Sequence, residues 1–230
     1  MGEGIGNEAQ LMPYINTANI ACGYHAGDAA TMQYVIELCL QYHVNIGAHP
    51  SFPDKENFGR TAMQLPLADV YNIVTDQLKI INTAVEKYNA KLHHVKPHGA
   101  LYNMAANDAP LAKAIAQAVK DFDASLIYYG LSGSVMIIEA EKLGLKTANE
   151  VFADRTYQAN GTLTARHQPN ALLHDKDAVI KQVLKFIEQN KVTATTGEEI
   201  FILADTVCIH GDGTHAVEFA KAIHQAINEK

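Results

Sequence analysis

Hydrophobic residues recur along this chain at the spacing of helices that pack one face against a core. Four segments show this spacing, with apolar positions three or four residues apart. We predict an amphipathic helix over each of these segments: Met32 to Leu40, Val70 to Val85, Val179 to Ile187 and Phe219 to Ile227.

Short apolar runs between the helical stretches have the length of buried strands. Strands that alternate with helices favour parallel pairing, because each strand needs a crossover to return in the same direction. The order of strands and helices along the chain is compatible with a doubly wound sheet and with a barrel, and does not distinguish between them. No repeat or linker divides the sequence, so we predict a single domain over residues 1–230. The predicted strands are Thr17–Ala21, Val44–Ala48, Leu92–Val95, Leu126–Tyr129, Lys146–Val151 and Thr206–His210.

Polar or glycine-rich turns follow nearly every predicted strand. In parallel α/β folds the carboxyl ends of the strands share one edge, where sites are normally built. We therefore expect the ionisable residues of these turns to converge on one rim. The turns are Cys22–Asp28, Gly47–Ser51, Lys96–Gly99, Phe152–Arg155 and His210–Gly213.

The composition narrows the class of protein. A net charge of -7 argues against a nucleic-acid partner, because the phosphates of a nucleic acid would have to be met by a basic face of the protein. No apolar run is long enough for a spanning helix, and the start lacks the features of a signal peptide. The three cysteines, Cys22, Cys39 and Cys208, form no Cys-x-x-Cys pair and are interpreted as reduced thiols. We predict a cytoplasmic protein without a membrane partner.

The segment Lys96-Pro97-His98-Gly99 is the strongest candidate for a catalytic segment. Pro97 fixes the backbone and Gly99 permits an unusual turn, so Lys96 and His98 are presented together at a strand end. A lysine supplies a compact positive charge for an oxyanion or a phosphate, and a histidine can move protons near neutral pH. We predict that this segment is the centre of a catalytic site.

Two further histidines are expected on the same rim. His25 has no local structural duty, whereas His49 could equally be a hydrogen-bonded structural residue. Asp28 is placed either to cap the following helix or to take part in catalysis, and both interpretations stay open.

The remaining charged candidates lie in loops. The long segment through Phe58-Gly59-Arg60 is interpreted as a lid, as a contact for a substrate anion, or as an ordinary surface loop. Asp154 and Arg155 either form a bracing ion pair or act in the site, where Arg155 would hold a carboxylate through two hydrogen bonds.

Common nucleotide and nucleophile motifs do not fit the chain. The run Gly211–Ala216 matches G-x-G-x-x-A, but it follows the last strand and lacks the expected acid downstream, so a dinucleotide role is disfavoured. There is no G-x-x-x-x-G-K-[ST] phosphate loop and no G-x-S-x-G elbow.

Together these segments resemble the LamB/YcsF family, which includes the A subunits of bacterial 5-oxoprolinases. The resemblance covers nearly the whole chain. It is carried by Gly2–Gly4, Ala18–Asp28, Gly47–Asp54, Phe58–Arg60, His94–Asn103, Glu150–Arg155 and Val207–Asp212.

The resemblance implies an α/β fold, an irregular seven-stranded β/α barrel related to polysaccharide deacetylases. It also implies an ATP-dependent hydrolase that opens 5-oxoproline to glutamate with separate B and C subunits, the ATP being bound with magnesium. On this interpretation His98 or His49 delivers water to the activated carbon. Lys96 offsets charge on the oxygen, and Arg155 or Arg60 holds the substrate carboxylate. The expected catalytic residues are His25, Asp28, His49, Lys96, His98 and Asp154, and the expected substrate-binding residues are Asn19, Ser51, Arg60, Asn103 and Arg155.

One departure from the family pattern concerns the start of the chain. The family usually begins with Asp-Leu-Asn-x-Asp-Leu-Gly-Glu, whereas here Met1 stands where that motif has its second leucine. We therefore expect the first barrel strand and its acids to be missing. Related deacetylases hold a metal with an acid of that strand and histidines, so the metal stays unassigned, with His25 and His49 as possible ligands.

Two alternatives remain open at this stage. One is a metal-dependent, deacetylase-like amidohydrolase that acts alone, and it would need neither ATP nor partners. The other is a non-catalytic scaffold subunit, which would tolerate the loss of both Lys96 and His98.

Overall fold

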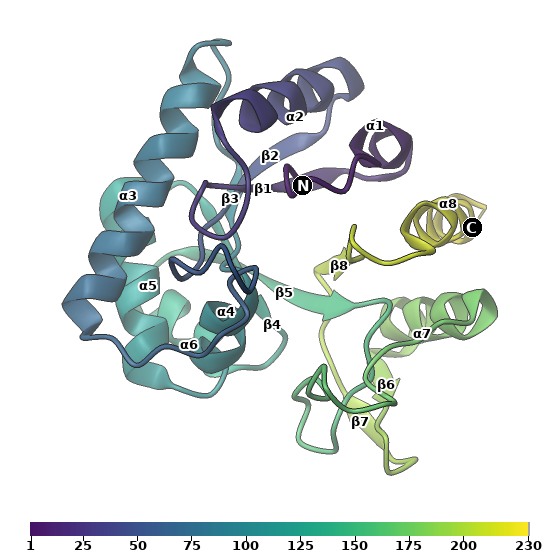
Figure 1. Ribbon diagram of the computed structural model, residues 1–230. Coiled ribbons are helices and arrows are strands. Elements are labelled where there is room, and N and C mark those ends of the chain that lie inside the picture. The colour runs from purple at the N-terminus through teal and green to yellow at the C-terminus, as the bar shows by residue number, and fades with distance from the viewer. Residues whose placement is uncertain (230) are drawn as a thin grey trace. The chain divides into compact units, whose positions relative to one another are not determined.

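The computed structural model describes residues 1–229, which form two compact units (Figure 1). Unit 1 consists of Met1–Gly130 and Ser134–Thr147, and unit 2 consists of Leu131–Gly133 and the chain from Ala148 on. The single domain over residues 1–230 stays a prediction.

The strands of unit 1 pair in parallel and in the order of the chain. In a doubly wound sheet the strand order reverses at a switch point, whereas strands that follow one another in order form the wall of a barrel. The α/β class is therefore confirmed, and the strand order favours the barrel-type arrangement over the doubly wound one. The strands are β1 (Thr17–Ala21), β2 (Asn45–His49), β3 (His94–Val95) and β4 (Ile127–Leu131).

The main helices of unit 1 pack side by side in chain order, α2 on α3, α3 on α5 and α5 on α6. Figure 1 shows α2, α3 and α5 along the outer side of these strands. The helices are α1 (Glu8–Leu11), α2 (Ala29–Tyr42), α3 (Leu67–Glu86), α4 (Gly99–Ala105), α5 (Ala109–Phe122) and α6 (Val135–Lys142), with a 3-10 turn, η1, at Met12–Tyr14.

The core of unit 1 consists of strand and helix side chains that solvent does not reach. Ile20 of β1, Ile36 of α2, Leu78 of α3 and Ile115 of α5 are each 0% exposed. Burying one side chain of this size stabilises the fold by roughly 1.5–3 kcal/mol. The predicted stripes of α2 and α3 thus largely coincide with the faces that hold these helices against the strands, except that Leu40 of the first stripe is 40% exposed.

Unit 2 contains one parallel strand pair and one hairpin. β5 (Lys146–Phe152), which lies in unit 2 from Ala148 on, pairs with β8 (Thr206–Cys208), and Phe152 lies opposite Cys208. The hairpin, which the sequence analysis did not predict, joins β6 (Lys191–Thr193) and β7 (Glu199–Phe201), and the helices α7 (Lys176–Gln189) and α8 (Ala216–Asn228) pack together.

All six predicted strands are present, with some ends shifted. The third is shorter than predicted and begins at His94, and the last ends at Cys208. Residues 1–6 contain bends and no strand. They nevertheless reach the sheet, because the backbone oxygen of Met1 accepts a hydrogen bond from the backbone nitrogen of Ala21 at 3.0 Å.

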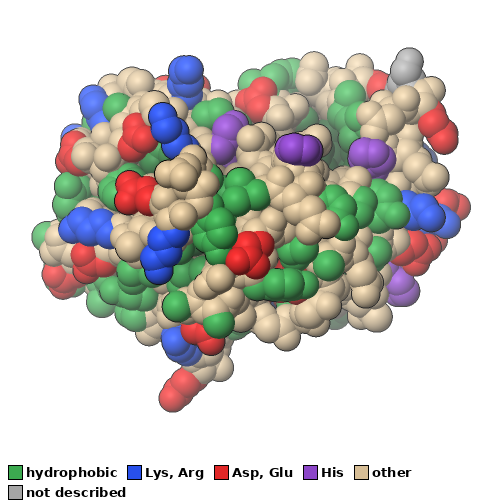
Figure 2. All heavy atoms as spheres, turned by 90° about the horizontal axis from the view of Figure 1, so that it is seen from above, with side chains coloured by type: hydrophobic (Ala, Val, Ile, Leu, Met, Phe, Trp, Pro, Cys, Tyr) green, Lys and Arg blue, Asp and Glu red, His purple; other side chains and the backbone are tan. Residues whose placement is uncertain are grey.

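The surface carries charges of both signs. On the face seen in Figure 2, lysine and arginine side chains lie among acidic ones and form no broad basic patch. Within residues 1–229, no helix combines the length and the apolar character needed to cross a membrane.

Candidate functional site

Three histidines from different turns of unit 1 meet at the carboxyl ends of its strands. His25 follows β1, His49 is the last residue of β2, and His98 follows β3. The rings of His25 and His98 stack with centroids 3.8 Å apart, and the His49 ring lies edge-on, 4.8 Å from that of His98. All three side chains are buried. The structure thus brings together three of the predicted catalytic residues.

Backbone carbonyl groups fix the tautomers of two of these histidines. His49 Nδ1 lies 2.6 Å from the oxygen of Lys96, and His98 Nε2 lies 2.8 Å from the oxygen of Phe58. A carbonyl oxygen only accepts, so each of these nitrogens carries the hydrogen. The other two nitrogens, His49 Nε2 and His98 Nδ1, face each other 3.0 Å apart.

Burial keeps both of these rings neutral. The pKa of His98 is lowered to about 3, first by burial and then by the charge of His25, although Glu3 and the Phe58 carbonyl oppose the shift. Burial, followed by the charges of His98 and Lys96, lowers the pKa of His49 well below its ordinary value. At neutral pH the two facing nitrogens therefore present lone pairs to each other.

Glu3 completes the cluster, and the sequence analysis did not predict it as a site residue. Its Oε1 atom lies 3.2 Å from His25 Nε2 and 4.0 Å from His98 Nδ1. Burial raises the pKa of this carboxyl, but the amino group of Met1 and the hydrogen bond to His25 outweigh it and lower the pKa to about 2. Glu3 is therefore ionised beside the histidines. The family motif at Gly2–Gly4 contained the only signal for it.

Ser51 positions His25. Its Oγ atom lies 2.9 Å from His25 Nδ1 and donates to the oxygen of Phe52. The backbone of Ser51 is held in turn by the buried side chain of Gln77, which bonds both its nitrogen and its oxygen. His25 thus uses one ring nitrogen on Ser51 and the other on Glu3.

The loop through Phe58 closes over the histidines. The Phe58 ring meets the rings of His25 and His98 edge-on, at 5.4 and 5.2 Å. Gly59 follows with a φ of +65°, and its oxygen accepts a hydrogen bond from the nitrogen of Ala100 at 2.9 Å. The exposed Arg60 places its guanidinium 4.9 Å from the Phe58 ring centroid. The loop is therefore packed on the histidines and carries an exposed cation, and its contact with a substrate anion stays a prediction.

Lys96 adjoins this cluster through its backbone oxygen, which contacts His49. Its side chain is buried and its Nζ atom lies 5.6 Å from the centroid of the Tyr102 ring. Its positive charge contributes to the low pKa of His49, so it acts on the site electrostatically.

Three other predicted residues of unit 1 have different surroundings. Asp28 caps α2 and accepts from the backbone nitrogen of Thr31 at 2.8 Å, while the Thr31 hydroxyl accepts from the backbone nitrogen of Asp28 at 2.7 Å. Asn19 Oδ1 lies 2.9 Å from Nε2 of the buried His94. Asn103 lies on α4, and its backbone oxygen accepts from the Asn107 side chain.

The last two predicted residues lie in unit 2. His210 Nδ1 lies 2.9 and 3.0 Å from the two carboxylate oxygens of Asp154. Arg155 is buried and donates to the backbone oxygens of Thr164 and Ala171. The guanidinium of Arg155 therefore braces unit 2 through backbone oxygens, and Asp154 pairs with His210, whereas the sequence left open a bracing Asp154–Arg155 ion pair or a role of both residues in the site.

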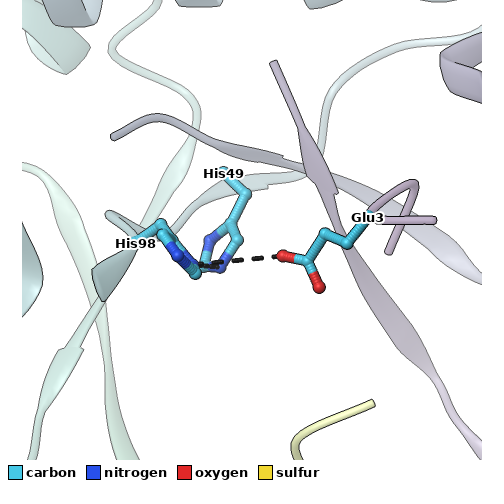
Figure 3. A group of neighbouring side chains, drawn as sticks. All are labelled: Glu3, His49 and His98. Atoms are coloured by element: carbon cyan, nitrogen blue, oxygen red, sulfur yellow. Dashed lines mark hydrogen bonds and ion pairs between the residues drawn. The ribbon is translucent and has the colours of Figure 1, made fainter. Parts of the chain in front are cut away.

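Glu3, His49 and His98 are the residues of this cluster that suit a metal ion (Figure 3). Each offers one ligand atom, and the three atoms lie within 4.8 Å of one another. Figure 3 shows the carboxylate and the two rings pointing toward one another. His25, which the sequence analysis named as a possible ligand together with His49, has both nitrogens engaged with Ser51 and Glu3.

Comparison with known proteins places the chain among relatives over its whole length. The sequence model of the LamB/YcsF family matches residues 1–230. The A subunit of the 5-oxoprolinase of Shouchella clausii is 52% identical over 219 residues, which cover 95% of this chain and 87% of that protein. The protein of the same name from Tolumonas auensis is 49% identical, over 97% of this chain and 89% of its own length.

A solved structure shares the fold. The crystal structure of the lactam utilization protein from Thermus thermophilus matches with a TM-score of 0.91 and 38% sequence identity. The match covers 97% of this chain and 90% of that one.

Proposed function

Since the chain belongs to the LamB/YcsF family, we propose that it works as the A subunit of a 5-oxoprolinase, hydrolysing the ring amide of 5-oxoproline to glutamate. Relatives at about half identity carry the name of that subunit, and a structural neighbour is named for lactam utilization. The observation in the chain itself that carries the proposal is the buried cluster of Glu3, His25, His49 and His98 at the strand ends.

The reaction adds water across a stable five-membered amide. We assign ATP the role of activating the carbonyl oxygen: its terminal phosphoryl group is transferred to that oxygen and ADP leaves, with the B and C subunits as partners. The oxygen of a water molecule then bonds to the carbonyl carbon, the ring C–N bond breaks, and the leaving nitrogen takes a proton, so that the new carboxyl group carries the phosphate. A second water molecule releases this phosphate, giving glutamate and inorganic phosphate. Lys96 would then offset negative charge near the reacting oxygen.

The geometry changes the roles that the sequence suggested for the histidines. A nitrogen with a pKa of about 3 is a weak proton acceptor at neutral pH, which disfavours His98 as the general base. The ionised Glu3 carboxylate lies beside the rings of His25 and His98, and we assign it the orientation of the attacking water. His49 and His98 then supply lone pairs at fixed positions and do not titrate during the reaction.

Arg60 is the better candidate for holding the substrate carboxylate. Its guanidinium is exposed and lies on the Phe58 ring of the covering loop. Arg155 already donates to two backbone oxygens, and moving it would leave these buried acceptors unpaired. We therefore expect Arg60→Ala to raise the KM for 5-oxoproline more than it lowers kcat.

The proposal is tested by mixing the purified chain with its B and C partners, ATP and 5-oxoproline, and measuring glutamate release. Release should require every component and should fall at least about 100-fold in Glu3→Gln, in line with the usual contribution of a positioned acid or base. His174→Ala, which changes a histidine of unit 2, serves as the control and should match the wild type. Unchanged release without this chain would overturn the proposal.

A second candidate is favoured by the Glu3–His49–His98 set alone. Two histidines and a carboxylate are the protein ligands of many zinc hydrolases, so the chain could open amides without ATP or partners. The same assay without ATP and partners distinguishes the two: glutamate release that persists there and disappears with a chelator supports this candidate.

A further inference from the structure

The facing nitrogens of His49 and His98 form an arrangement that needs a positive charge between them. Each ring donates its other nitrogen's hydrogen to a backbone oxygen, that of Lys96 for His49 and that of Phe58 for His98. Two lone pairs 3.0 Å apart repel each other unless a proton or a metal ion lies between or beside them. The backbone thus directs two ligand atoms at one point.

The spacing of these nitrogens fits coordination. Zinc binds histidine nitrogen at about 2.0–2.1 Å in tetrahedral geometry, so the nitrogens of two ligands of one ion would be about 3.3–3.4 Å apart. The observed distance between His49 Nε2 and His98 Nδ1 is 3.0 Å. The two nitrogens are therefore close to the separation of two ligands of one ion, and a small outward movement of one ring would complete the fit.

Glu3 supplies the charge that two neutral imidazoles lack. Its Oε1 atom is 4.0 Å from His98 Nδ1, and all three candidate ligand atoms lie within 4.8 Å of one another. A small approach of this carboxylate completes a set of two histidines and one carboxylate. Zinc and other divalent transition metals prefer such a set, whereas calcium and magnesium prefer oxygen ligands alone.

The surroundings of the three residues match the outer shell of known metal sites. Metal-binding histidines usually donate their second nitrogen to a carbonyl or carboxylate, and ligating carboxylates usually accept a hydrogen bond as well. Here Lys96 and Phe58 provide the carbonyls, and His25 Nε2 donates to the Glu3 carboxylate. His25 also stacks on the His98 ring and so limits its rotation.

We propose that Glu3 Oε1, His49 Nε2 and His98 Nδ1 bind one divalent transition-metal ion, zinc being the best fit, with at least one coordination position left for water or substrate. His25 acts as a positioning residue that holds the Glu3 carboxylate. The site does not depend on the identity of the substrate, so it can hold even if the 5-oxoprolinase assignment fails.

Binding is tested on the full chain after removal of metals with a chelator. Isothermal titration with zinc chloride should show one strong site per chain, and zinc should raise the melting temperature. Glu3→Gln, which keeps the size of the side chain, and His98→Ala should each weaken binding by at least about 100-fold, because removing an outer partner alone usually costs 10–100-fold. His93→Asn alters a half-buried histidine outside the cluster and should bind zinc like the wild type.

Cobalt(II) provides a second readout that does not rely on stability. The wild type should develop the visible absorption of a nitrogen- and oxygen-coordinated cobalt ion, and Glu3→Gln should alter or lose it while its circular dichroism stays native. Zinc binding of equal strength in wild type, Glu3→Gln and His98→Ala would place the metal elsewhere and overturn the proposal. Absence of a strong zinc site in the folded wild type would overturn the proposal as well.

Discussion

Replacing Gly59 by alanine should damage the cluster from the covering loop without touching any of its polar groups. Gly59 has a φ of +65°, and an added Cβ would lie 2.9 Å from His25 Cβ and 2.9 Å from His98 Cδ2. The rings of His25 and His98 have little room to move, because they stack on each other and contact the Phe58 ring edge-on. The new methyl group can therefore be accommodated only if the loop or the two rings move.

Two costs add in this variant, and a control separates them. An alanine at positive φ loses about 1–2 kcal/mol of the free energy of unfolding, and overpacking of a filled site typically adds about 1–3 kcal/mol. Gly144 also lies in unit 1, with a φ of +81°, but nothing would lie within 4 Å of its added Cβ. Gly144→Ala should therefore show the first cost alone.

Urea unfolding of the two variants, followed by circular dichroism, measures the difference. Gly59→Ala should be less stable than Gly144→Ala by about 1–3 kcal/mol. Its zinc affinity should also fall, because the oxygen of Phe58 that fixes the His98 tautomer moves with the loop. If Gly59→Ala were as stable as Gly144→Ala and bound zinc normally, the loop would not be packed on the histidines as described.

Three further predictions concern the frame of unit 1. Gly47→Ala should lower the free energy of unfolding by about 1–3 kcal/mol, because the added Cβ would overlap the His94 ring. In a His94→Ala background, where that ring is absent, the same change should cost less than about 0.5 kcal/mol, and a double-mutant cycle measures the difference. Asp28→Ala should lower the free energy of unfolding, measured by thermal unfolding, by about 1 kcal/mol, because the α2 cap is lost, whereas Asp28→Asn should keep most of the stabilisation by the cap. Equal stabilities of the wild type and Asp28→Ala would refute the role of Asp28 as the cap. Burial lowers the pKa of His94 to about 3. Between about pH 6.5 and 3 the unfolded chain therefore binds a proton at His94 and the folded chain does not, so the free energy of unfolding decreases as the pH falls. His94→Gln should flatten this dependence by up to about 1.4 kcal/mol per pH unit between about pH 6 and 4, and an unchanged slope would contradict the assignment.

The strands and their polar ends could be predicted from the sequence because each depends on local pattern. Apolar runs marked β1, β2 and β3, and the turn after each placed His25, His49 and His98 on one edge. Parallel pairing then brings these turns together whatever their separation along the chain. The residue-by-residue pairing of the strands did not have to be known to predict that these histidines lie at one edge of the sheet.

Other parts of the site depend on contacts that the local pattern does not contain. Glu3 lies outside any predicted strand, and its hydrogen bond to His25 shows that it faces the cluster. For Asp154 the sequence offered an ion pair with the adjacent Arg155 as one interpretation, but in unit 2 Asp154 faces His210, which is 56 residues away in the chain. Pairings of this kind follow from tertiary packing and cannot be predicted from spacing.

The elements that were not predicted are of two kinds. The apolar face of α5 is present in the sequence at helical spacing and includes Leu111, Ile115 and Val119 beside three alanines, so this helix could have been predicted. In the β6–β7 hairpin each strand has three residues, and Phe201 is 72% exposed. Such short, exposed strands do not alternate long enough to be recognised.

The fixing of the two histidines by main-chain oxygens has a consequence for the evolution of the site. Every amino acid carries the same carbonyl group, so the orientation of His49 and His98 is determined by the path of the chain at positions 96 and 58 and not by the side chains there. Substitutions of Lys96 or Phe58 can thus change the charge and cover of the site while the two imidazoles keep their tautomers. A change in the length of the loop between Ser51 and Gly59, by contrast, would move the Phe58 carbonyl and so disturb the His98 ring itself.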